Sequence, residues 1–209
     1  MEYPQAPWRL QGRAVCLLQL LDVSRVASSV PSELSIVSLL PGKTLGGIYL
    51  TEYGARSVLA YHELIVISAL VRYGHRLGAW ISHIYVDDPR SVVGGREIWG
   101  LPKQLAEFTW DEPSGPAVVR QGEQHLCILR STRRLPLARL PVFVPALSRK
   151  GEDLVWFRGT GTARPAIIWG ELDVPSTSPF SVLGFKRGLG IYLHSLEVLV
   201  HSPVHLTKR

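Results

Sequence analysis

A long succession of short apolar segments, separated by turns rich in glycine and proline, most restricts how this chain can fold. Valine, isoleucine and aromatic residues are abundant in these segments, which favours strands. The strands that we expect are Arg13 to Leu21, Gly47 to Leu50, Val58 to Leu70, Trp80 to Val86, Phe108 to Trp110, Ala117 to Arg120, His125 to Thr132, Val142 to Val144, Leu154 to Phe157, Ala163 to Leu172 and Ile191 to Val200. Val58 to Leu70 also fits a helix, and Gly159 to Gly161 indicates a turn. Strands at this spacing indicate a barrel or sandwich rather than a parallel α/β fold.

Two short helices interrupt these strands in our prediction. Asp22 would cap a helix from Val23 to Ser29, which stops ahead of Pro31 because the residue before a proline avoids the helical region. A second helix would run from Pro179 to Leu183 and end at Gly184.

The longest predicted helix runs from Arg90 to Trp99. Asp88 followed by Pro89 is a typical N-cap and first helical residue, and Gly100 suits the left-handed position that ends a helix. The Gly94-Gly95 pair costs about 1 kcal/mol per glycine relative to alanine inside a helix. We therefore expect another backbone to pack closely against that face.

The length of 209 residues predicts a single domain, residues 1–209, with a core large enough to need no disulfides. Cys16 and Cys127 each lie in an apolar run, so we expect two reduced core thiols and a cytoplasmic protein. The first residues resemble no secretory leader, and no apolar stretch has the roughly eighteen residues of a membrane span. We expect a soluble protein that does not bind a membrane.

The net charge of +6 raises the question of nucleic-acid binding. The arginines are scattered, and the densest group is short: Arg130, Arg133, Arg134 and Arg139. We therefore expect no nucleic-acid partner. A basic surface would instead raise the local concentration of an anionic metabolite.

Sequence motifs for cofactors and metals are missing. Gly42-Lys43-Thr44 is no phosphate-binding loop, because Val37 stands where that motif needs its first glycine, and Gly94-Gly95 lacks the GxGxxG spacing. The histidines are His62, His75, His83, His125, His194, His201 and His205. They show no metal-ligand spacing, so only convergence in the fold would assemble a metal site. We predict neither a cofactor nor a metal.

Lys103 is the first candidate for chemistry, because lysine is scarce and this one lies among apolar residues. Burial disfavours the ammonium form, which leaves a nucleophilic amine near neutral pH and predicts a Schiff-base lysine. The alternative is a solvated cation just past a helix end. Glu63 is the second candidate, since it is followed by Leu64 to Ile67 and would donate protons from an apolar cavity. Its alternative is a carboxylate that faces solvent or pairs with an arginine.

The run Gly95-Arg96-Glu97, followed by Gly100-Leu101-Pro102-Lys103, resembles the GRE…xPKK signature of the acetoacetate decarboxylase family. The first lysine of that pair forms a Schiff base in the family. Tyr61-His62-Glu63 is similar to a Y-x-E segment that supplies a cavity glutamate there. Arg13 is similar to an arginine that faces the substrate at the start of an early strand. Gln104 stands in place of the second lysine, which in the family supplies a neighbouring cation.

The resemblance implies a mainly β, β-rich α+β fold: a closed antiparallel β-barrel with a flanking sheet and a few short helices, assembled into a homo-oligomer. It implies Lys103 and Glu63 as catalytic residues and Arg13 as a substrate-binding residue. Arg96, Gln104 and Trp99 would be supporting residues, with Arg96 as a replacement source of charge. The implied function is a lyase that decarboxylates a small β-keto acid such as acetoacetate. An aldolase or dehydratase using the same iminium, and a non-catalytic ligand-binding relative, are the alternatives.

Overall fold

The computed structural model describes residues 2–110 and 115–206, without the side chains of residues 132–134, and it is mainly β, as predicted. The strands are β1 (Trp8–Asp22), β2 (Ser35–Ile36), β3 (Lys43–Tyr53), β4 (Tyr61–Tyr73), β5 (Arg76–Val86), β6 (Lys103–Leu105), β7 (Glu107–Trp110), β8 (Ala117–Gln121), β9 (Gln124–Pro136), β10 (Leu140–Lys150), β11 (Asp153–Asp173), β12 (Gly188–Val200) and β13 (Val204–Leu206). The helices are α1 (Val23–Val26), η1 (Ala27–Ser29), α2 (Pro89–Trp99) and η2 (Ser181–Leu183).

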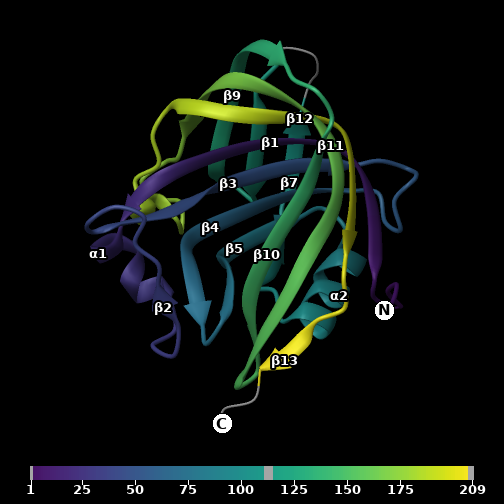
Figure 1. Cartoon of the computed structure of the whole chain (residues 1–209). Coiled ribbons are helices and arrows are strands. Elements are labelled where there is room, and N and C mark those ends of the chain that lie inside the picture. The colour runs from purple at the N-terminus through teal and green to yellow at the C-terminus, as the bar shows by residue number, and fades with distance from the viewer. Residues whose placement is uncertain (1, 111–114, 207–209) are drawn as a thin grey trace.

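The strands pair around a ring (Figure 1). The order β10-β5-β4-β3-β1-β12-β11 returns to β10 because β10 also pairs with β11, and β9, β8 and β7 continue from β11 as a flanking sheet. Most pairs are antiparallel, but β10–β5 and β5–β6 are parallel. The prediction of an antiparallel arrangement was wrong at these two pairs. Helix α2 crosses over between β5 and β6, and such a crossover brings the next strand back parallel.

One ambiguous strand prediction is confirmed, and one turn prediction is wrong. The segment predicted as Val58 to Leu70 is a strand and not a helix, although it begins at Tyr61. The turn predicted at Gly159 to Gly161 does not exist, because β11 runs straight through it. A Cβ atom on Gly161 would lie 1.8 Å from the carbonyl oxygen of Glu197 in β12. Gly161 is therefore required by the close approach of two backbones and not by a turn.

The predicted caps of α2 are confirmed. The Asp88 carboxylate accepts a hydrogen bond from the backbone N–H of Arg90 (2.7 Å), and Gly100 has the left-handed conformation with φ 65°. The predicted helix from Val23 to Ser29 is present as α1 followed by η1, but its predicted cap is not. Asp22 makes no side-chain cap, because its carboxylate pairs with Lys43 Nζ (2.7 Å). The predicted Pro179 to Leu183 helix is only the turn η2, since the buried Phe180 keeps a non-helical conformation ahead of it.

The two faces of the ring strands serve different purposes. Along β4, Leu64 and Val66 pack into an outer core that the flanking sheet covers, whereas Glu63, Ile65 and Ile67 face the inside of the ring. This is the alternation expected of a strand buried on both faces. In the described part of the chain, no helix has the length and apolar character needed to cross a membrane.

Candidate active site

Lys103 lies at the start of β6 with its side chain turned into the ring. Strand β6 pairs with β5 so that Lys103 lies beside Ile84, and the residue is only 2% exposed. Its Nζ atom donates to Glu63 Oε1 at 2.6 Å and to Ser91 Oγ at 2.9 Å. The rings of Trp8 and Tyr61 lie within 5.6 Å of the same atom and complete an apolar surround. A buried amine is thus held by one carboxylate and one hydroxyl.

Helix α2 and its C-terminal turn hold the lysine backbone. Arg96 Nε donates to the carbonyl oxygen of Lys103 at 2.8 Å, and Lys103 N donates to the carbonyl oxygen of Leu101 at 2.8 Å. Arg96 was expected to supply charge near the amine, but its described contact positions the backbone of the lysine.

The Gly94-Gly95 pair of α2 makes room for two side chains, and not for the backbone that the sequence led us to expect. A Cβ atom on Gly95 would lie 2.5 Å from Lys103 Cδ, and one on Gly94 would lie 2.7 Å from Trp8 Cζ2. The lysine and a tryptophan of the cavity wall therefore pass directly over the helix surface.

Glu63 and Ser91 reach the lysine from different elements, β4 and α2. Glu63 lies on β4 between Thr51 of β3 and Val86 of β5, and it is 5% exposed. Ser91 is fully buried in the first turn of α2, just after the capping residue Asp88. Nothing in the sequence singled out Ser91, because one serine in a helical turn has no motif of its own.

Three tyrosines surround this group. Burial raises the pKa of Tyr61 well above its usual range, the Glu63 charge adds to that rise, and a hydrogen bond with Ser91 opposes it. Burial likewise raises the pKa of Tyr53 and Tyr49. All three keep their phenolic protons at neutral pH and can donate hydrogen bonds near the amine.

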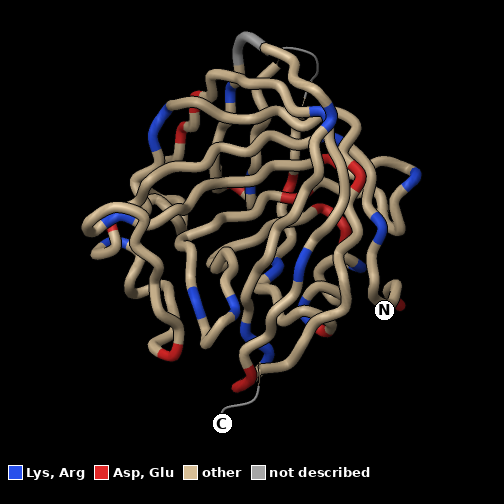
Figure 2. Tube along the Cα trace, in the orientation of Figure 1, with Lys and Arg blue, Asp and Glu red and all other residues tan. Residues whose placement is uncertain are grey.

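The lysine opens onto a cavity of about 390 Å³ inside the ring. Among the described residues that line it, the charged side chains are Lys103 and Glu63, and the rest are mostly aliphatic or aromatic. Figure 2 marks the charged residues along the trace, in which several strands have long stretches without one. Trp99, expected as a supporting residue, lies in the cavity wall, stacks edge-on against Trp8 at 4.9 Å and donates to the carbonyl oxygen of His201.

Residues 1–151 match the family described as acetoacetate decarboxylase (ADC). The chain belongs to this family. Protein NEOXANTHIN-DEFICIENT 1 of Solanum lycopersicum is 32% identical over 107 residues, which are 51% of this chain and 36% of that protein. Acetoacetate decarboxylase 1 of Mesorhizobium japonicum is 30% identical over 116 residues, which are 51% of this chain and 42% of that protein. The chain thus spans less than half the length of these curated relatives.

Solved structures share the decarboxylase fold. The acetoacetate decarboxylase of Legionella pneumophila superposes with a TM-score of 0.75 at 19% identity, covering 98% of this chain and 89% of its own. The enduracididine biosynthesis enzyme MppR, complexed with pyruvate, superposes with a TM-score of 0.73 at 14% identity, covering 98% of this chain and 91% of its own. At these identities the likeness shows a common fold.

Arg13 lies outside the cavity of this decarboxylase-family chain, so the expectation that it faces the substrate is not met. Neighbouring residues of a strand point to opposite faces, and Cys16 of β1 lines the cavity, which places Arg13 on the outer face. There its Nε donates to Glu52 Oε2 at 2.7 Å, and its guanidinium lies over the Trp110 ring at 4.8 Å.

Gln104 also points away from the amine. It follows Lys103 in β6, is exposed, and accepts a hydrogen bond from Gln121 Nε2 at 3.2 Å. The side chain at this position therefore lies outside the cavity, and its identity bears little on the environment of the Lys103 amine.

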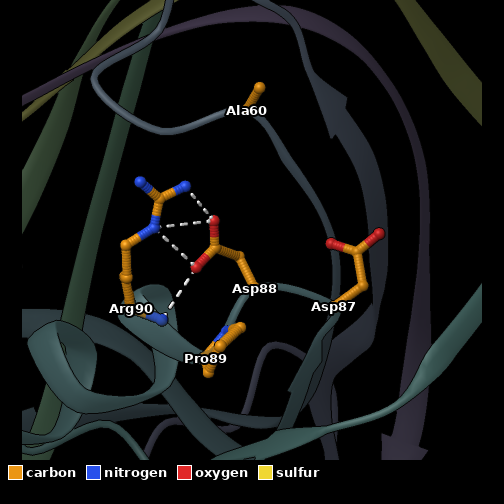
Figure 3. A pocket seen from close by; sticks show the side chains of 5 residues that line it. All are labelled: Ala60, Asp87, Asp88, Pro89 and Arg90. Carbon is orange, nitrogen blue, oxygen red and sulfur yellow. Dashed lines mark hydrogen bonds and ion pairs between the residues drawn. The ribbon is translucent and has the colours of Figure 1, made fainter. Parts of the chain in front are cut away.

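A second hollow, of about 420 Å³, lies on the surface at the start of α2 (Figure 3). Its charged groups already have partners within the chain. Asp88 accepts from the guanidinium of Arg90 at 2.7 Å, and Asp87 accepts from the backbone N–H of His62 at 2.7 Å. Over residues 2–110 and 115–206, no group of at least three His, Cys, Asp or Glu side chains could hold a metal ion. The cavity at Lys103 is accordingly the candidate active site.

Proposed function

We propose that this chain is a carbon–carbon lyase in which Lys103 forms a Schiff base with a keto acid and decarboxylates a β-keto acid. The observation that carries the proposal is the buried Lys103–Glu63 pair, with Nζ and Oε1 2.6 Å apart in an otherwise apolar cavity. A cavity with few, converging polar groups is the usual form of a small-molecule site.

The pair itself supplies the reactive form of the amine. The reaction needs a neutral amine, and Glu63 Oε1, 2.6 Å from Nζ, is placed to accept the proton that the amine must give up. That transfer within the pair yields a nucleophilic amine beside a carboxylic acid. No second cation is needed for this, which agrees with the outward direction of Gln104.

The reaction then follows from the two groups. The Lys103 amine adds to the ketone carbon, and the acid proton of Glu63 helps the oxygen leave as water, which gives an iminium. The bond to the carboxylate breaks, its electron pair moves to the iminium nitrogen, and carbon dioxide leaves. Glu63, which gave up its proton in the dehydration, regains one from water and passes it to the enamine carbon. Water then releases the ketone and restores the amine.

Aldol or dehydration chemistry on the same iminium is a second candidate. The fold is shared with MppR, of which one structure holds the condensation product of pyruvate and imidazole 4-carboxaldehyde, at a TM-score of 0.71. An enamine on Lys103 would attack an aldehyde in place of a proton. Binding without turnover is a third candidate, because the plant relatives are named for neoxanthin deficiency and not for a reaction.

Product analysis tests these candidates. Incubation with acetoacetate is expected to release carbon dioxide, Lys103→Arg to abolish the release, and Glu63→Gln to slow it by about 10²- to 10⁴-fold, the usual size of general acid–base catalysis. Condensation of pyruvate with an aldehyde, without release of carbon dioxide, would favour the second candidate. Binding of both keto acids without any product would favour the third.

We also propose that the ring acts as a closed barrel and that the chain forms a cytoplasmic homo-oligomer. Support for an oligomer comes from a set of exposed apolar residues on β1, β9, β11 and β12: Leu20, Leu135, Ile167, Trp169, Leu189 and Ile191. Contiguous apolar surface of this kind marks contacts between proteins. A molar mass in solution of a single chain, at micromolar concentration, would contradict the proposed assembly.

A further inference from the structure

We infer that the substrate of this site carries a long apolar tail, which lies along the cavity while its carbonyl group meets Lys103. This rests on the proposed function, because it names the class of carbonyl compound that the lysine would attack. The inference rests on three features of the cavity: the charges of its lining, the length of its wall and the position of its opening.

The charges of the cavity argue against a small, highly polar substrate. Among the described residues that line the cavity, Lys103 is the one basic residue. Its Nζ atom already donates hydrogen bonds to Glu63 and Ser91. Arg13, the expected partner for a carboxylate, lies on the outer face of β1. A carboxylate that leaves as carbon dioxide needs no lasting partner here, but a carboxylate that stays on the product would be buried without one.

The length of the cavity wall exceeds what a small keto acid can fill. Glu63, Ile65 and Ile67 of β4 line the cavity, and so do Ala69 and Leu70 beyond an irregularity in the pairing with β5. At about 3.3 Å per residue, the wall from Glu63 to Ala69 is roughly 20 Å long. An extended chain of roughly a dozen carbons, with bonds of about 1.5 Å, fits along it. The volume of about 390 Å³ falls in the range of pockets that hold drug-sized molecules.

The opening lies in the half of this wall that is farther from the lysine. Leu18 lines the cavity but is 42% exposed, and the strand register puts it in one row with Gly47 and Ile67. That row is four residues from Glu63, or about 13 Å along β4. Phe143 of β10 also lines the cavity and is 61% exposed. A tail can therefore reach from Lys103 to an apolar mouth.

A series of neutral methyl ketones tests the inference directly. Acetone, 2-pentanone, 2-octanone and 2-undecanone are each titrated against the whole chain with borohydride, and the concentration for half-maximal adduct on Lys103 is measured by mass spectrometry. We expect this concentration to fall by up to about fourfold for each added methylene, as the burial of one methylene predicts. Equal values for acetone and 2-undecanone would overturn the inference while leaving the Schiff base intact.

A matched pair of variants locates the tail. Leu18→Glu puts a charge at the mouth, whereas Val58→Glu changes a residue of the loop between β3 and β4 that is 39% exposed and does not line the cavity. We expect Leu18→Glu to raise the half-saturation value of 2-undecanone several-fold more than that of acetone, and Val58→Glu to leave both values unchanged. Equal effects of the two variants on 2-undecanone would contradict a tail at Leu18.

The failure of the proposed function has a different signature. If no ketone forms an adduct, Lys103 is not a Schiff-base residue, and calorimetry without borohydride then decides the inference by itself. Tighter binding of 2-undecanone than of acetone would support the apolar-tail site, and equally weak binding of both would overturn it.

Discussion

The side chain of Lys103 lies directly across Gly95, eight positions earlier in the chain, so that a Cβ atom on Gly95 would come within 2.5 Å of Lys103 Cδ. The helix that positions the lysine therefore also carries the gap through which the lysine reaches the cavity. The GRE…PK run is a packing unit in which the glycine makes room, Arg96 binds the lysine carbonyl and Gly100 turns the chain.

Gly95→Ala should impair chemistry without unfolding the chain. Alanine gains about 1 kcal/mol of helix propensity over glycine, but its methyl group must displace the flexible lysine side chain. Misplacement of a reacting group by about 1 Å can cost on the order of 10²-fold in rate, so we expect a loss of that size in adduct formation. Gly94→Ala is the matched control, because its methyl group meets Trp8 and not the lysine. Equal losses in the two variants would contradict this account.

Asp88→Ala should destabilise α2 from its first turn. The variant loses the hydrogen bond from the Arg90 N–H, and loss of an N-cap costs about 1 kcal/mol. Hydrogen bonds from Arg90 hold the pKa of Asp88 below its usual 3.8. The stabilisation that ionised Asp88 gives the folded state is therefore present above pH 3.8. It is lost as the pH falls through the lower pKa that Asp88 has in the folded state. In urea unfolding, acid should lower the free energy of unfolding less in Asp88→Ala than in the parent chain. An equal loss in both would contradict this role of Asp88.

Much of the fold could be predicted from apolar periodicity and turn residues, since the strands and the capped helix follow from local chemistry. What failed depends on partners distant in the sequence. Gly161 looks like a turn glycine, and only the nearby Glu197 backbone shows that β11 continues through it. The parallel pairing of β6 with β5 likewise depends on how α2 packs.

The candidate site could be predicted in part. The motifs indicated Lys103 and Glu63, and the fold brings them into contact. Arg13 was misplaced because a strand shows only that alternate residues share a face, and the register with β3 decides which face is inside. Ser91 escaped notice since its contact with the lysine depends on the angle between α2 and β6.

Stability should fall at alkaline pH. Burial raises the pKa of the Cys16 and Cys127 thiols from 9.0 to about 12. The stability of the folded state with both thiols protonated is therefore intact below about pH 9 and is lost as the pH rises toward 12. In that window each thiol lowers the free energy of unfolding by up to about 1.4 kcal/mol per pH unit. Urea unfolding at rising pH measures this slope, and Cys127→Ala should reduce it. A slope that is the same with and without the thiol would refute the assignment.

Gln104→Lys should have little effect on the chemistry. The side chain at this position is exposed and lies on the opposite face of β6 from the Lys103 amine, so a new ammonium there is screened by water. We expect the pH dependence of adduct formation to match that of the parent chain within about a factor of two. A tenfold gain at neutral pH would show that the second position acts on the amine after all.

The proposed chemistry depends on Lys103 being a nucleophile, and borohydride trapping tests that most directly. The chain is incubated with acetoacetate and borohydride and then digested. The masses of the peptides that contain Lys103 and Lys43 are measured by mass spectrometry. Lys43 is the matched control, a partly exposed lysine whose Nζ lies 2.7 Å from the carboxylate of Asp22. A nucleophilic Lys103 predicts a reduced ketone adduct on Lys103 and none on Lys43. An unmodified Lys103, or equal modification of both lysines, would contradict it.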